Sequence, residues 1–67
     1  MKKVRENRND RMKVVDAVAA FRKSKGLSQP AMAAVLGVSF RTYQSWELHT
    51  SAPTVPAARY LKSFLEE

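Results

Sequence analysis

Hydrophobic residues recur along the chain in four segments, each with the spacing of three or four residues that places them on one face of a helix. No segment shows the two-residue alternation of hydrophobic and polar positions that is typical of a half-buried strand. The pattern therefore predicts an all-α fold of four short helices. The apolar positions are Val14, Val18 and Phe21 in the first segment, Met32, Val35 and Leu36 in the second, Tyr43 and Trp46 in the third, and Ala57, Leu61, Phe64 and Leu65 in the fourth.

Glycine, proline and capping residues indicate where these helices begin and end. Gly26 and Gly37 follow the first and second segments, and glycine readily adopts the left-handed conformation that ends a helix. Pro30 and Pro56 fall in expected first turns, where proline is tolerated. Residues 1–9 have no hydrophobic period, so we expect an N-terminal arm before a domain of residues 10–67. The residues whose side chains can cap the start of a helix are Asn9 or Asp10, Ser28, Ser39 and Thr54.

Only three residues separate the second and third helices, which is the arrangement of a helix-turn-helix over about residues 29–48. Ala33 is small enough for the two helices to pack closely. Gly37 can provide the sharp turn between them through a positive φ angle. We expect the core beneath this turn to contain Met32, Leu36, Val38, Tyr43 and Trp46.

Charge is distributed unevenly along the 67 residues, which carry twelve Lys and Arg against six Asp and Glu, a formal net charge of +6. Residues 1–25 contain nine of the bases and three of the acids, whereas residues 26–67 are neutral overall. This asymmetry favours an anionic partner such as nucleic acid. A solvated helix face and a tail that only aids solubility are also compatible with charge alone.

Composition excludes several classes of function. The chain has no cysteine and its single histidine is His49, so we expect no disulfide framework, no Cys/His zinc site, and no metal or cofactor. No apolar run approaches the roughly 20 residues of a membrane span. The polar N-terminus does not resemble a signal peptide, so we expect a cytoplasmic protein without a membrane partner. Paired carboxylates, a nucleophile–base set and a phosphate-binding loop are all missing, so we do not expect an enzyme.

Three runs within this pattern carry a family resemblance: Gly26-Leu27-Ser28-Gln29, Leu36-Gly37-Val38-Ser39 and Arg41-Thr42-Tyr43-Gln44-Ser45-Trp46-Glu47. Over roughly residues 14–65 the chain resembles the Cro/C1-type (XRE) helix-turn-helix family of DNA-binding proteins. Its later half, with Trp46-Glu47 and then residues 53–58, is most similar to HigA-like antitoxins. Small phage repressors and regulators of anti-CRISPR operons share the architecture. The resemblance implies a compact lambda-repressor-like bundle of four or five helices with a central helix-turn-helix.

The resemblance further implies that residues 40–48 form a recognition helix in the DNA major groove. The side chains suit this role, because arginine can pair with guanine, glutamine can pair with adenine, and phenylalanine can pack on a thymine methyl group. The expected base contacts are Phe40, Arg41, Gln44 and Ser45. The expected phosphate contacts are Gln29, Ser39 and Thr42, to which we add the bases of the arm, Lys2, Lys3, Arg5 and Arg8.

Two further features follow from the resemblance. Arg22 and Glu47 match a family pair that forms a buried ion pair between the first helix and the recognition helix. The chain departs from the family after Glu47, where members often carry Asn-Gly or Gln-Gly with basic residues. Here the segment is Leu48-His49-Thr50-Ser51, which contains no lysine or arginine. A usual set of phosphate contacts is thereby removed, and the N-terminal bases can compensate.

One helix-turn-helix reads about half of an operator, so we expect a homodimer on an inverted repeat of double-stranded DNA. The hydrophobic residues of the last helix exceed what a four-helix core must absorb, and the expected dimer surface is Val55, Tyr60, Phe64 and Leu65. The chain is interpreted as a sequence-specific bacterial or phage repressor of its own operon. Two alternatives stay open: an antitoxin that binds and neutralises a toxin protein, and a repressor of an anti-CRISPR operon.

Overall fold

The computed structural model of the protein describes residues 8–66 and contains four α-helices in this range. They are α1 (Arg8–Ser24), α2 (Gln29–Leu36), α3 (Phe40–Glu47) and α4 (Val55–Leu65). No strand occurs within these residues, and the expectation of an all-α helical bundle is confirmed. The first helix begins at Arg8, two residues before the expected domain boundary, so Arg8 and Asn9 are helical.

The helix ends follow the capping chemistry expected from the sequence. The side-chain oxygens of Ser28, Ser39 and Thr54 each accept a hydrogen bond from the backbone N–H three residues later, at 3.1, 3.1 and 3.2 Å. Gly26 and Gly37 have φ angles of 70° and 78°, a conformation in which most side chains are strained. The backbone N–H of Gly37 donates into the last turn of α2, so the chain leaves that helix and turns directly into α3.

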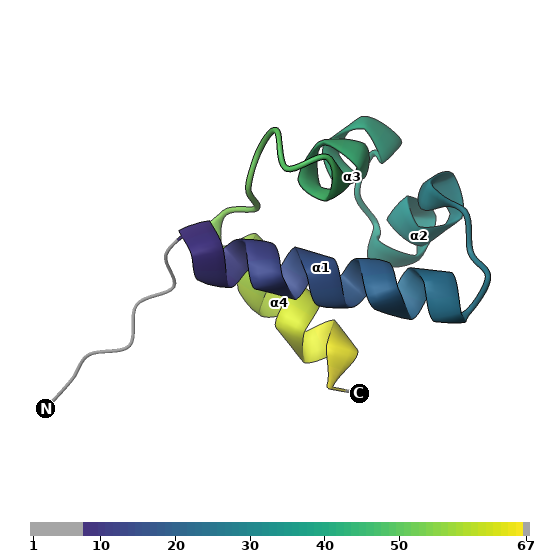
Figure 1. Cartoon of the computed structure of the whole chain (residues 1–67), viewed down its shortest axis with the longest axis horizontal. Helices are drawn as coiled ribbons and strands as arrows, with labels where there is room; N and C mark the ends of the chain where they lie inside the picture. The colour runs from purple at the N-terminus through teal and green to yellow at the C-terminus, as the bar shows by residue number, and fades with distance from the viewer. Residues whose placement is uncertain (1–7, 67) are drawn as a thin grey trace, which may run out of the picture.

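The longest helix, α1, lies between α4 on one side and the α2–α3 pair on the other (Figure 1). Phe21 joins α1 to α4 through an edge-to-face contact with Phe64, whose ring centre lies 5.3 Å away. The next residue, Arg22, bonds to α3 instead. Because α1 has neighbours on two sides, its apolar face is wider than the predicted stripe. Met12, Val15 and Val18 are buried, and Val14 and Phe21 pack partly against the same core.

The core beneath the helix-turn-helix contains the expected residues Met32, Leu36, Tyr43 and Trp46, which are buried, and Val38, which is partly buried. The prediction that Val35 belongs to the apolar face of α2 is wrong, because its side chain is 52% exposed. The face that meets the core is already covered by Met32, Ala33 and Leu36. Val35 lies roughly 100° around the helix from the centre of that face.

Candidate functional site

The helix α3 has a buried face and a solvent face. Phe40, at its first position, is 42% exposed, and Arg41 beside it is also exposed. Gln44 and Ser45, one turn later, are half-buried at the edge of the solvent face. The four side chains named from the sequence as base contacts are therefore all accessible to solvent, with the two largest at the N-terminal end of the helix.

Polar groups frame this end of α3. The Ser39 hydroxyl accepts the backbone N–H of Thr42 and donates to Thr42 Oγ1 at 2.9 Å. Because Thr42 Oγ1 accepts this bond, its own hydroxyl hydrogen is available to an outside acceptor. Gln29, the first residue of α2, is half-buried and uses one of its amide hydrogens in an internal bond. Its second amide hydrogen can serve an outside acceptor in the same way.

A cluster of hydrogen bonds holds the C-terminal end of α3 against α1 and the start of α2. The Glu47 carboxylate accepts bonds from Arg22 Nε at 2.8 Å and Nη2 at 3.2 Å, from Gln29 Nε2 at 2.7 Å, and from the Tyr43 hydroxyl. Arg22 Nη1 also donates to the carbonyl of Leu27 at 2.9 Å. The side chains of Arg22 and Glu47 are only 13% and 9% exposed. One carboxylate thus connects three helices. We call Arg22, Gln29, Tyr43 and Glu47 the Glu47 cluster.

Tyr43 has a role in this cluster that the hydrophobic pattern does not predict. Its ring is fully buried, as expected for a core residue, but its hydroxyl reaches Glu47. The spacing of four residues between Tyr43 and Glu47 is the one signal in the sequence, since residues four apart on a helix are neighbours. Burial and hydrogen bonding are compatible here because the phenol has an apolar body and a polar tip.

The environment of the Glu47 cluster sets its charge states. Burial by itself raises the pKa of the Glu47 carboxyl, but hydrogen bonds from Arg22, Tyr43 and Gln29 outweigh burial, and the net pKa lies below the ordinary 4.5. Burial and then the neighbouring carboxylate raise the pKa of the Tyr43 hydroxyl above its ordinary value. At neutral pH the cluster therefore contains an ionised Glu47 and a Tyr43 that remains a donor.

The structure describes one of the four arm bases named from the sequence. Arg8 lies exposed in the first turn of α1. Lys2, Lys3 and Arg5 lie outside the described residues.

The four residues of α4 named as a dimer surface differ in exposure. Tyr60 is 50% exposed, and its hydroxyl donates to the carbonyl of Leu36 at 3.0 Å, which ties α4 to the end of α2. Val55, Phe64 and Leu65 are half-buried. Of these, Phe64 and Leu65 pack against the core, so part of the apolar surface assigned to a partner is used inside the domain.

Residues 8–66 contain no group of three or more histidine, aspartate or glutamate residues that could hold a metal ion. None of the helices in this range is long and apolar enough to cross a membrane.

Comparison with known families gives one match. A family model described as helix-turn-helix matches residues 18–59, from the middle of α1 into α4. This range includes the left-handed turn at Gly37, the whole of α2 and α3, and both members of the Arg22–Glu47 pair. No curated protein and no solved structure matches the chain significantly.

Proposed function

The chain belongs to the Cro/C1-type helix-turn-helix family of DNA-binding regulators, and on this basis we propose that it is a dimeric repressor of its own operon. The dimer covers an inverted-repeat operator and excludes RNA polymerase by occupying the promoter. As a bacterial or phage repressor it acts in the cytoplasm, where the operator DNA is found.

The exposed N-terminal end of α3 carries this function. Phe40 and Arg41 are consecutive exposed residues, directly after the turn that joins α2 to α3. An aromatic ring at such a position is suited to the methyl group of thymine, and a guanidinium can bond bidentately to guanine O6 and N7. Gln44 and Ser45 then read neighbouring base edges from one turn further along the helix.

Phosphate contacts orient α3 in the groove. Thr42 and Gln29 each have a hydrogen left to donate after their internal bonds. The hydroxyl of Ser39, which caps the start of α3, already donates to Thr42 and so contributes to phosphate binding by orienting that residue. Donors at the ends of two adjacent helices bind the sugar–phosphate backbone without reading sequence, so they determine the register and angle of the recognition helix. The basic arm adds the sequence-independent attraction.

A duplex from immediately upstream of the protein's own gene tests the repressor assignment. We expect a footprint of two half-sites about one helical turn apart and binding that weakens steeply as salt rises from about 50 to 200 mM. A scrambled duplex of equal length should bind much more weakly and show no footprint. Failure of the wild-type protein to shift the upstream duplex at low salt would contradict the proposal.

The dimer surface that we propose is centred on Tyr60. Its ring is half exposed, and its hydroxyl donates to the carbonyl of Leu36 at the end of α2. Val35, the residue before Leu36, is 52% exposed. We propose that these two apolar side chains, one from each helix, contribute to one surface that a second copy of the chain can bury. Val55, Phe64 and Leu65 support this surface from α4.

Replacing Tyr60 with aspartate is expected to raise the dissociation constant of the dimer by at least about tenfold, because a charge would be buried at the centre of the contact. Tyr60 is a sharper target than Phe64 or Leu65, which pack against the core; its replacement also removes the hydrogen bond to the carbonyl of Leu36, so thermal unfolding of the variant accompanies the measurement. Sedimentation of the protein without DNA measures the effect. The matched control is Ser51→Asp in the exposed loop before α4. An unchanged proportion of dimer in Tyr60→Asp would rule out this surface.

A further inference from the structure

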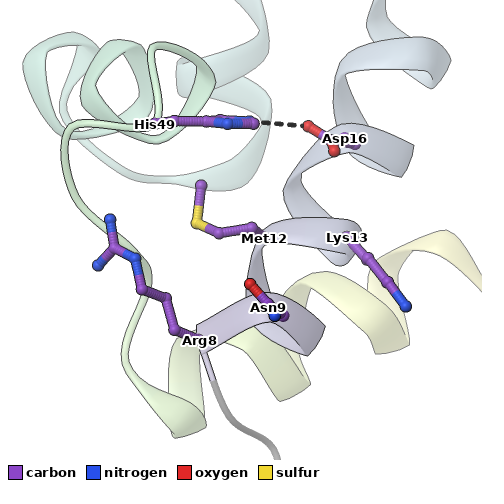
Figure 2. Close-up of a pocket in the computed structure, with 6 residues that line it drawn as sticks. All are labelled: Arg8, Asn9, Met12, Lys13, Asp16 and His49. Carbon is purple, nitrogen blue, oxygen red and sulfur yellow. Dashed lines mark hydrogen bonds and ion pairs between the residues drawn. The ribbon is translucent and has the colours of Figure 1, made fainter.

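A cleft lies between the first turns of α1 and the loop that follows α3 (Figure 2). It is lined by Arg8, Asn9, Met12, Lys13, Asp16 and His49. All of these except Arg8 stand outside the residues that the sequence indicates as DNA contacts. The hydrophobic pattern gives no sign of the cleft, because His49 and Asp16 are 33 residues apart and meet only through the fold.

His49 holds the loop against α1. Its backbone adopts a left-handed φ of 63°, and its Nε2 donates to Asp16 Oδ1 at 3.0 Å. The following residue, Thr50, is bound back to α3, with its N–H 3.0 Å and its hydroxyl 3.2 Å from the carbonyl of Ser45. Hydrogen bonds therefore link the loop to α1 on one side and to α3 on the other.

The groups that line the cleft favour an anion. Arg8 and Lys13 are exposed bases, and Asn9 lies between them with an amide that can donate. In Figure 2 the Arg8 guanidinium extends towards the loop that carries His49, while Lys13, on the opposite side of α1, extends away from that loop. Asp16 is the one carboxylate of the lining, and its Oδ1 is already engaged by His49.

We propose that this cleft binds a phosphate of the DNA backbone beside the major groove that α3 enters. The inference rests on the DNA-binding function proposed above; it places Arg8, already expected as a phosphate contact, in a defined site and adds Asn9 and Lys13 as backbone contacts. The loop between Leu48 and Ser51 contributes no base of its own, but it directly follows α3 and brings α1 next to the C-terminal end of that helix. A DNA duplex presents one phosphate per about 1.7 Å of its axis. Basic side chains held next to a recognition helix therefore lie close to the phosphate backbone that borders the groove.

Binding of the single variants Arg8→Ala and Lys13→Ala to the upstream duplex and to a scrambled duplex tests the site. For each variant we expect weaker binding to both duplexes by the same factor. The slope of log affinity against log salt concentration should decrease in magnitude by about one for each basic side chain removed. Lys62→Ala is the matched control, because Lys62 is an exposed base on α4, which contacts α1 from the other side. Thermal unfolding of every variant checks that the fold is intact.

Three results would overturn the site while leaving the proposed function standing. The first is a salt dependence of Arg8→Ala and Lys13→Ala equal to that of wild type, and the second is an equally reduced salt dependence in Lys62→Ala. The third is a loss of affinity confined to the upstream duplex, which would indicate contact with a nucleobase. A wild-type protein that binds neither duplex at low salt overturns the proposed function itself.

Discussion

Glu47→Ala is expected to destabilise the folded protein by about 3 kcal/mol, the largest effect of any single change considered for this chain. The substitution leaves Arg22, which is 13% exposed, without its carboxylate, and it leaves the hydroxyl of Tyr43 buried without an acceptor. A domain of this size has only about 3–5 kcal/mol from its core, so most of its stability would be lost. Chemical and thermal unfolding measure the loss, which corresponds to a fall in Tm of roughly 12–24 °C.

The matched control is Glu66→Ala, which removes the same charge from an exposed position after α4. It should change the free energy of unfolding by less than about 0.5 kcal/mol. A Glu47→Ala protein as stable as this control would mean that the Glu47 cluster contributes nothing to folding.

The same variant has a defined pH signature. Because the pKa of Glu47 in the folded protein lies below its ordinary 4.5, the unfolded chain takes up the proton first as the pH falls. The contribution of Glu47 is therefore complete above that ordinary value and is lost as the pH falls through the lower folded pKa. The difference in Tm between wild type and Glu47→Ala should accordingly narrow over the range of pH below the ordinary 4.5. A difference that stayed constant over this range would contradict the lowered pKa.

Arg41→Ala is expected to weaken binding to the operator by about 1–3 kcal/mol, or about 5- to 150-fold, and to relax specificity at one base pair. Arg41 is exposed next to Phe40 at the start of α3, and removing it takes nothing from the buried core. The loss should fall on the cognate duplex much more than on a scrambled one. Titration of both duplexes, with every base pair of a half-site varied in turn, identifies the position that Arg41 reads.

Arg59→Ala is the control for this experiment, since Arg59 is an exposed arginine on α4. It should leave the ratio of operator to scrambled affinity unchanged. If Arg41→Ala weakened both duplexes equally, Arg41 would be a backbone contact, and base reading would fall to Phe40, Gln44 and Ser45.

The parts of the fold that were predictable are those decided by residues close together in the chain. A serine or threonine caps a helix through a backbone N–H only three residues away, and a glycine ends one through its own φ angle. The ends of α2 and the start of α3 therefore agree with the capping pattern. The burial of Met32 and Leu36 also follows from local periodicity, because one face of a short helix must meet the core.

Features that depend on which helices become neighbours were harder to predict from the sequence. Val35 satisfies the same spacing rule as Leu36 and is nonetheless exposed, because the face of α2 that is buried depends on how this helix packs, chiefly against α3. Arg22 and Glu47 could be paired from a family pattern, but the additional bonds from Tyr43 and Gln29 required three helices to converge. The pairing of His49 with Asp16 had no local signal at all.

The sequence by itself determined an all-α chain, its turn at Gly37 and the identity of the side chains at the start of α3, since these depend on contacts within about one helical turn. The tertiary structure alone decided that α1 lies between α3 and α4, that Tyr43 and Gln29 join Arg22 at the Glu47 carboxylate, and that Arg8 extends towards the loop after α3. The physical reason is that side chains far apart in sequence acquire neighbours only when the helices pack. Hydrogen bonds formed at that stage favour one arrangement among the several that hydrophobic burial would allow.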